Sequence, residues 1–323
     1  MSSVTVTQFK LGAYEKASLL LMKTVTPLHI GVGRVTGVVD LPIIRDALGF
    51  PVIPTSSLKG ALRSQLSEAL NKEEIRVFFG PEPGDEEAYM GALAFTEGYL
   101  LAIPVRSVRG IWALATSPVL INRFLKMIQM MQSLEPSAKE HEELCEELLK
   151  EGESMGVDQA LLCEEGEKKL SIEIMDKRSI IINEEFQFEC KQSKNIREFF
   201  ESIRVSEPWR GILLHDDMIR DVVERSILRR SRIRLKKAEK IVEEGGLWSE
   251  EDLPAETFFF TILLYSKPRK PDEKIKDVDG VKGKIINLLL SDVKQKRGYA
   301  IFGGHETIGR GVVELIGLAG CSL

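Results

Sequence analysis

Apolar residues recur along this chain with two different periods, which predicts a mixture of strands and helices. Segments rich in apolar residues lie at 17–25 and 258–265, which predicts strands over residues 17–30 and 256–265. A helical period follows Ser117-Pro118, where apolar side chains recur at positions 120, 124, 128 and 131. Serine as N-cap with proline at the first helical position favours a helix start.

The predicted elements follow one another in an order that indicates an α+β fold. A strand–helix–strand–strand–helix series comes early, and a strand–helix–strand unit closes the chain. Helices covering one face of an antiparallel sheet would fit this order. The expected strands are 17–30, 91–104, 110–115, 230–236, 256–265, 299–302 and 312–316, with short β-like runs within 171–190. The expected helices are 57–70, one from Ser117, 195–203, one capped by Asp216 or Asp217 and running to about 225, and 278–294.

Length and composition describe an ordinary globular protein. At 323 residues the chain can form one large domain or two average ones. The longest apolar run, near 258–265, is too short to cross a bilayer, and the N-terminus lacks the basic and apolar regions of an export signal. Four cysteines lie far apart without CxxC spacing. We therefore expect reduced thiols in a cytoplasmic protein without membrane contact.

Charge is distributed unevenly, although the net charge of −5 argues mildly against nucleic-acid binding. Between Glu135 and Lys169 twelve acidic residues face four lysines, whereas the range from Arg225 to Lys237 holds seven cations and no acid. We interpret the acidic segment as an inserted helical hairpin with a solvated acidic face or, alternatively, as a protein-docking surface. The basic segment favours a local nucleic-acid track, because charge distribution decides this question better than net charge does.

Within the basic segment, cations alternate with other residues. In a strand this spacing places Ile233 and Leu235 on one face and the cations on the other. These cations are Arg230, Arg232, Arg234 and Lys236. The face could be a surface strip of salt bridges, but its one-sided spacing favours a strand lying along a phosphate backbone. No aromatic residue interleaves with the cations, so base stacking is not indicated here.

The segment from Thr26 to Arg63 contains the densest group of candidate functional residues. Glycines at positions 31, 33 and 37 allow the backbone to turn, and Asp40 follows on the same loop. His29 lies at the end of the preceding strand. Ser56 or Ser57 is expected to cap the next helix.

Two cations follow in the first turns of that helix. Lys59 and Arg63 are four residues apart, so they share one helix face. Together with the N–H groups of a helix N-terminus they would suit phosphate. Ordinary solvated cations would have the same spacing.

A second glycine-rich loop occupies residues 303–311. Gly304, His305 and Arg310 could form an anion-binding nest from backbone amides and cationic side chains, or the loop could be a tight strand connection. It lacks the GK[ST] of a Walker A motif, so we expect no nucleotide triphosphatase.

Three segments, in order along the chain, carry a resemblance to a known family. They are TPLHIG, GVVDLPI and IPTSSLKGALR within 26–63, GLWSEEDLPAET at 246–257, and GGHETIGRG at 303–311. They resemble the RAMP superfamily of CRISPR proteins, and the first segment is most similar to the backbone subunit of the type III-B (Cmr) effector, which is repeated along the guide RNA. Together the three segments span the chain.

The resemblance implies a single RAMP domain over residues 1–323. Its core would be a modified ferredoxin-like (RRM-like) palm with an antiparallel sheet, formed by 17–134 and 256–323 with the loop 31–55. The acidic helical insertion would occupy 135–170, and the thumb with its connecting segments would occupy 171–255. Patterning alone does not predict this strand order.

The resemblance also implies a catalytic role for Asp40, because the family's target-RNA-cleaving aspartate lies in this GVVDLPI loop. Asp40 could hold a divalent cation, Mg²⁺ or Mn²⁺, since such ions prefer carboxylate and water oxygens. It could equally orient the 2′-hydroxyl of the target for attack on the adjacent phosphate. His29 is the second candidate, because histidine can donate a proton near neutral pH. A turn aspartate and a core or edge histidine are the structural alternatives.

A further family acid is matched less securely by Glu256. The family's Glu-x-Tyr pattern reads Glu256-Thr257-Phe258 here. The tyrosine hydroxyl is lost, so a structural strand start is the favoured interpretation.

The leading hypothesis is an RNA-guided ribonuclease subunit. Its expected partners are CRISPR guide RNA, target RNA, further copies of itself in a filament, and other Cmr subunits. One alternative is a scaffold that binds guide RNA without cutting. Another is a metal-independent endonuclease for CRISPR precursor RNA, for which only His29 and His305 could supply the acid–base pair.

Overall fold

Two apolar strands, β1 (Tyr14–Thr24) and β13 (Phe258–Ser266), form the centre of the main sheet. They pair antiparallel, with Leu19 opposite Ile262, in a computed structural model that describes residues 11–82, 84–236, 242–270, 275–292 and 294–321. All nine residues of β13 are buried. The apolar runs therefore identify both strands correctly, although the first ends at Thr24 and does not continue to residue 30.

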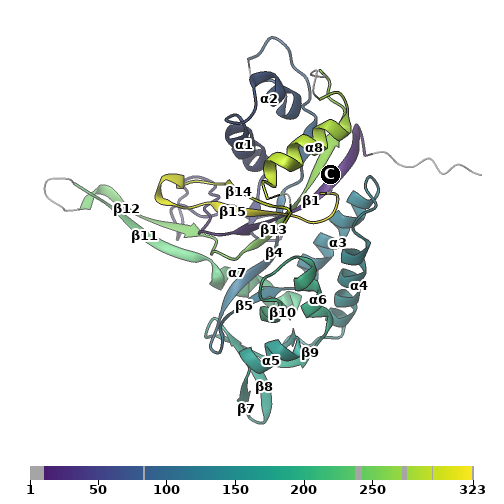
Figure 1. Cartoon of the computed structure of the whole chain (residues 1–323). Coiled ribbons are helices and arrows are strands. Elements are labelled where there is room, and N and C mark those ends of the chain that lie inside the picture. Colours follow the sequence, from purple (N-terminus) through teal and green to yellow (C-terminus); the bar gives the residue numbers. More distant parts are fainter. Residues whose placement is uncertain (1–10, 83, 237–241, 271–274, 293, 322–323) are drawn as a thin grey trace, which may run out of the picture.

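The central strands are arranged in the order β14-β15-β1-β13-β4, and every neighbouring pair is antiparallel (Figure 1). Two short strands join this region, β2 at β4 and β3 at β13. The bounds are β2 (Val52–Ile53), β3 (Leu93–Phe95), β4 (Gly98–Ser107), β14 (Arg297–Ile301) and β15 (Val312–Gly317).

β4 also belongs to a closed ring of six strands in the order β4-β5-β10-β6-β9-β8, which a pairing between Ser107 and Ile182 completes. The bounds are β5 (Ile111–Thr116), β6 (Gln159–Leu162), β8 (Lys177–Ile182), β9 (Phe186–Gln192) and β10 (Gly211–Leu214), and β7 (Ile172–Ile174) pairs with β8 outside the ring. The pairs β5–β10 and β6–β9 are parallel. The fold is α+β as predicted, but its sheet is not purely antiparallel.

Helices cover both faces of the central sheet (Figure 1). One face packs against α1 (Thr55–Leu66), α2 (Lys72–Phe79) and α8 (Val278–Leu289). The other packs against α3 (Pro118–Gln132), α4 (Lys139–Glu153) and α6 (Asn195–Ser202). The expectation that helices cover only one face of the sheet is wrong, because β1 presents apolar side chains on both faces. Leu20 and Met22 pack in one core, and Leu19 and Leu21 pack in the other.

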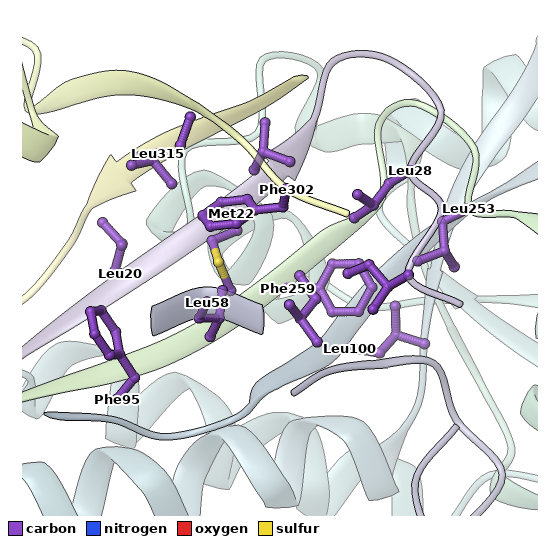
Figure 2. Close-up of a cluster of buried hydrophobic side chains, with 14 of the residues drawn as sticks. Leu20, Met22, Leu28, Leu58, Phe95, Leu100, Leu253, Phe259, Phe302 and Leu315 are labelled. Atoms are coloured by element: carbon purple, nitrogen blue, oxygen red, sulfur yellow. The ribbon is translucent and has the colours of Figure 1, made fainter. Parts of the chain in front are cut away.

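The first core lies between α1 and the sheet. Figure 2 shows Leu58 of α1 beside Leu20 and Met22 of β1, with Phe259 of β13 close by. On the opposite face Phe124 of α3 packs edge-on against Phe260, with ring centroids 4.9 Å apart. Each fully buried side chain of this size contributes roughly 1.5–3 kcal/mol, so both faces stabilise the sheet.

The acidic segment 135–169 contributes to the buried cores on both faces of the sheet. It forms α4, then β6 inside the six-stranded ring, then α5 (Glu164–Leu170). Cys145 and Leu148 of α4 are fully buried. The expectation of an inserted helical hairpin is therefore wrong, because the apolar residues between the acids pack inward.

A two-stranded antiparallel ribbon, β11 (Leu228–Leu235) and β12 (Val242–Asp252), extends away from the rest of the molecule (Figure 1). The strand predicted at 230–236 is confirmed through Leu235. Cross-strand neighbours Ile233 and Leu247 expose 54% and 61% of their surface on the ribbon. Lys237, counted with the basic segment, lies outside the described residues.

Two predicted caps differ from the structure. Pro54 is the N-cap of α1, so Ser56 and Ser57 lie inside the first turn. His215 caps α7 (Asp216–Ser226) by accepting a hydrogen bond from the backbone N–H of Asp217. The start at Ser117-Pro118 is confirmed. Two short 3₁₀ turns, Pro208–Arg210 and Glu306–Ile308, complete the fold, and across the described ranges no helix has the length and apolar character needed to span a membrane.

Candidate functional site

Four consecutive residues at the end of β12, Ser249 to Asp252, contact candidate residues from the loop after β1, from the loop after β14 and from the neighbouring strand β11. We call these four residues the ribbon base. They join the ribbon to the body of the molecule, and the loop after β1 crosses them through a parallel bridge between Leu41 and Glu250. The loop after β14 reaches them through His305 and Arg310.

Asp40 is bound to Ser249 by three hydrogen bonds. The carboxylate oxygen Oδ2 accepts from the backbone N–H of Ser249 at 2.8 Å and from its hydroxyl at 3.0 Å. The backbone N–H of Asp40 also donates to the Ser249 hydroxyl, at 3.0 Å. These bonds, the backbone N–H first and the hydroxyl second, hold the pKa of Asp40 below its usual value, and the nearby Arg34 charge adds to the effect. The side chain remains 37% exposed, so an ionised carboxylate faces solvent.

His29 lies beside the same base but is nearly buried, with 6% of its surface exposed. Its Nδ1 is 2.6 Å from the backbone oxygen of Glu251, an oxygen that can only accept, so Nδ1 carries the proton. Nε2 is then the nitrogen left for chemistry. A side chain at position 31 would cover it, because a Cβ on Gly31 would lie 2.5 Å from Nε2.

His305 completes a pair of imidazoles. Its ring centroid is 5.1 Å from that of His29, and its Nε2 is 3.5 Å from a carboxylate oxygen of Glu250. Burial lowers the pKa of His305, and the Glu250 charge opposes that shift only in part. The side chain is 29% exposed, so a neutral, reachable imidazole stands next to His29.

Arg310 is a buried structural cation. Its guanidinium nitrogens lie 2.5 Å from Glu250 and 2.8 Å from Asp252. Burial would raise the pKa of Glu250, but the Arg310 hydrogen bond and charge hold it below the usual value. Burial dominates at Asp252 and raises its pKa. The hypothesis that Arg310 contacts RNA phosphate is therefore wrong, because both terminal nitrogens of its guanidinium group contact buried carboxylates.

Two backbone N–H groups of the glycine loop 303–311 are likewise already hydrogen-bonded within the protein. The N–H of Gly304 donates to the backbone oxygen of His29 at 2.9 Å, and the N–H of Gly311 donates to that of Pro27. A predicted nest with Gly304 as an anion ligand does not fit this bonding. The loop instead aligns His305 with His29.

The cations of the ribbon share one face, as predicted, and most are near acids of β12. Arg230 is 3.8 Å from Asp252, Arg232 is 3.4 Å from Glu250, and Arg234 is 3.8 Å from Glu243. Each keeps part of its side chain exposed, from 31% for Arg232 to 70% for Arg234. Lys236 lies at the far end of β11, just past its last residue.

An aromatic residue does accompany these cations. Trp248 on β12 lies opposite Arg232, and the guanidinium carbons of Arg232 and Arg234 are 5.8 and 6.0 Å from its ring centroid. The sequence interpretation missed it because the tryptophan comes from the partner strand.

Lys59 and Arg63 lie elsewhere, on one face of α1. Arg63 forms an ion pair of 3.5 Å with Glu82, and burial followed by the Arg63 charge lowers the pKa of Lys59. Pro54 supplies no side-chain cap, so the start of α1 keeps the character of an anion site. In the described part of the chain their contacts do not reach the ribbon base.

Glu256 occupies the turn before β13. Its backbone has φ of 66°, its N–H donates to the oxygen of Thr24, and its side chain is 3.6 Å from Lys23. These contacts agree with the structural strand start favoured from the sequence.

A metal site is not preformed in the described residues, where no group of three or more His, Cys, Asp or Glu side chains could hold an ion. Glu250 and Asp252 both form ion pairs with Arg310. Asp40 offers one carboxylate, so a divalent cation would need water and RNA phosphate oxygens for its other ligands, a donor set that Mg²⁺ accepts.

Ser249, Glu250 and Asp252 are site residues that the sequence analysis did not single out. A usable signal was present in WSEEDLP, where residues 250 and 252 must share one face of a strand.

Comparison with known proteins identifies relatives over nearly the full length. The RAMP superfamily profile matches residues 21–314. The CRISPR system Cmr endoribonuclease Cmr4 of Pyrococcus furiosus is 32% identical, with 93% of this chain and 95% of that protein covered. The CMR subunit Cmr4 of Saccharolobus solfataricus is 31% identical over 91% and 94%.

Solved structures agree with these relatives. A chain of the type III-B Cmr-beta complex bound to cognate target RNA matches with a TM-score of 0.76 and 28% identity, covering 95% of this chain and 98% of the other. Oligomeric Cmr4 from Pyrococcus furiosus matches with a TM-score of 0.61 and 26% identity over 94% and 98%. The chain therefore belongs to the RAMP superfamily, and within it to the Cmr4 family of type III-B backbone subunits.

Proposed function

We propose that this chain binds CRISPR guide RNA as the repeated backbone subunit of a type III-B effector and cleaves the target RNA paired with that guide. Its relative from Pyrococcus furiosus is named an endoribonuclease, and a structural neighbour was solved with cognate target RNA. Target RNA, guide RNA, other Cmr subunits and further copies of this chain are the partners of such a role, which would be performed in the cytoplasm.

The single observation that carries the catalytic proposal is the gathering of Asp40, His29 and His305 at the ribbon base. Asp40 contacts Ser249, His29 contacts the backbone oxygen of Glu251 and His305 contacts Glu250, so an ionised, partly exposed carboxylate and two imidazoles are attached to the same four residues. The same ribbon carries partly exposed arginines. Cations that hold a phosphate backbone along the ribbon would deliver RNA to these groups.

We assign the central chemical role to Asp40. Its second oxygen, Oδ1, could accept the proton of the target 2′-hydroxyl and orient that oxygen for attack on the adjacent phosphorus. The bond from phosphorus to the 5′-oxygen of the next nucleotide would break, leaving a cyclic phosphate, and the departing oxygen would take a proton from water. The contribution would come from placement more than from basicity, since the pKa of Asp40 is lowered. His29 would assist through Nε2, the nitrogen that the backbone of Glu251 leaves available.

Metal dependence is a separate part of the proposal. A Mg²⁺ or Mn²⁺ ion bound by Asp40 and RNA phosphate oxygens would stabilise negative charge in the transition state. The alternative is metal-independent cleavage by the His29–His305 pair, which the 5.1 Å ring separation supports. Cleavage that persists in EDTA would favour the histidines.

We further infer that β15-β1-β13-β4 form the ferredoxin-like palm. Their order, with α1 between β1 and β4 and α8 between β13 and β15, is that of a β-α-β-β-α-β unit. The ribbon would then be the projecting part of the thumb, and the six-stranded ring an elaboration built on β4.

Substitution of Asp40 by asparagine tests the catalytic assignment. Asp40→Asn keeps the shape of the side chain and removes its charge, so guide and target binding should survive. Single-turnover cleavage of labelled target should fall by about two to four orders of magnitude. A gel shift on the same samples supplies the binding control. Cleavage by Asp40→Asn at the wild-type rate would reduce Asp40 to a turn residue. If the wild-type protein itself binds guide RNA but does not cut, it is a scaffold.

A further inference from the structure

We propose that Ser249 is the positioning residue for Asp40 and holds the carboxylate in one orientation. The inference rests on the proposed role of Asp40 in cleavage. No motif of the sequence analysis assigned a function to Ser249, and its partner lies 209 positions away in the sequence.

The contacts between these two residues leave the carboxylate little freedom. One oxygen, Oδ2, receives both Ser249 donors, at 2.8 and 3.0 Å. The Ser249 hydroxyl in turn accepts from the Asp40 backbone N–H at 3.0 Å. Because three bonds close between two residues, Oδ2 is fixed. Oδ1, which lies 3.7 Å from Nη2 of Arg34 on a side chain that is 37% exposed, is the oxygen left to contact RNA.

Backbone bonds hold the loop itself, independently of the serine hydroxyl. The N–H of Leu41 donates to the oxygen of Ser249, and the N–H of Glu251 donates to the oxygen of Leu41, both at 3.0 Å. Replacing Ser249 by alanine would leave these bonds in place, together with the bond from the Ser249 N–H. The substitution therefore removes the orienting hydroxyl without detaching the loop from β12.

The charged group that faces Asp40 most closely is Arg34, whose Nη2 is 3.7 Å from Oδ1. Arg34 lies on the same loop and is 64% exposed, so its charge is largely screened by solvent. Hydrogen bonds to the ionised form are the main cause of the lowered pKa of Asp40. With hydrogen bonds of 2.8 and 3.0 Å against an ion-pair distance of 3.7 Å, Ser249 constrains the carboxylate more closely than Arg34 does.

The test compares Ser249→Ala, Ser249→Thr and the control Ser231→Ala in the guide-loaded protein. Ser231 is exposed and lies directly opposite Ser249 on β11, so it matches the chemistry and the strand position. We expect Ser249→Ala to slow single-turnover target cleavage on the order of 10-fold to 100-fold, as for a misplaced catalytic group. RNA affinity should stay at the wild-type value, and the threonine variant, which keeps the hydroxyl, should restore the rate.

Three results would overturn the proposal. The first is a wild-type cleavage rate for Ser249→Ala. The second is a loss of RNA affinity equal to the loss of rate, and the third is an equal effect of Ser231→Ala. The variants of Asp40 keep the two proposals apart: if Asp40→Asn cuts normally, the role of Asp40 itself fails. If Asp40→Asn is inactive while Ser249→Ala is normal, only the positioning role fails. The double variant should be no slower than Asp40→Asn alone.

Discussion

Replacing Arg310 by methionine should strongly destabilise the protein. Arg310 is the only side chain that forms close ion pairs with both Glu250 and Asp252 among the described residues. Both carboxylates are fully buried, and Arg310 itself is 7% exposed. Methionine fills a similar length of space with apolar atoms, so the perturbation is mainly the loss of charge and hydrogen bonds.

The expected magnitude follows from what remains after the substitution. Removing one partner of a buried ion pair typically costs about 3–5 kcal/mol, because an uncompensated charge stays buried. The weaker contacts from Arg230 and Arg232, at 3.8 and 3.4 Å, offset part of this cost. We therefore expect a decrease of about 3 kcal/mol in the free energy of unfolding near pH 7.

The decrease should depend on pH in a defined direction. Without Arg310, burial raises the folded-state pKa of both carboxyl groups above the unfolded value, so the folded variant takes up protons as the pH falls. The variant therefore loses stability relative to the wild type as the pH rises through the folded-state pKa of these carboxyl groups. The difference in the free energy of unfolding between the two proteins should be smaller near pH 5 than near pH 7.

Urea unfolding followed by tryptophan fluorescence measures both effects. Arg34→Met is the matched control, because Arg34 is 64% exposed and 3.7 Å from its acidic neighbour, and its loss should change stability by less than about 0.5 kcal/mol. A decrease below about 1 kcal/mol for Arg310→Met, or one that does not vary with pH, would refute the buried arrangement of Arg310, Glu250 and Asp252.

Three further predictions concern RNA binding, the acidic segment and His29. Charge reversal at Lys59 and Arg63 should weaken guide-RNA binding and reduce its salt dependence by roughly 0.7 per lost phosphate contact; an unchanged slope in a filter-binding titration would discard this contact. Replacing residues 135–169 by a short Gly/Ser linker should abolish cooperative unfolding, because β6 and the buried face of α4 are lost; a preserved melting transition would contradict that. His29→Ala should slow target cleavage less than Asp40→Asn does, since the proposed role of His29 is to assist Asp40; equal losses would make His29 the principal group.

Local structure follows from local sequence in much of this protein. The strand β13, the helix start at Ser117-Pro118 and the β8–β9 turn at Asn183-Glu184 depend on residues within a few positions of one another. The alternation in β11 also predicts correctly which cations share a face. These features need no information about distant parts of the chain.

The pairing of distant segments could not be predicted in the same way. The acidic segment reads as helix-prone, yet it supplies β6 to a ring whose neighbours β9 and β10 come later in the chain. The sequence indicates an RNA-binding cation at Arg310 in a glycine-rich loop, yet this side chain is buried and forms ion pairs with Glu250 and Asp252. In both cases the deciding partner lies far away in sequence, and its position is set by the packing of the whole sheet.

The sequence by itself determined the family motifs, the α+β class and the candidates Asp40, His29 and His305, because each depends on residue type and short-range spacing. Only the tertiary structure decided that these candidates meet at Ser249 to Asp252, that Lys59 and Arg63 lie elsewhere, and that Arg310 is structural. The physical reason is that hydrogen bonds and ion pairs act over a few ångströms in space, whatever the separation along the chain. Asp40 and Ser249 are 209 positions apart, and folding of β12 against the loop after β1 brings them together.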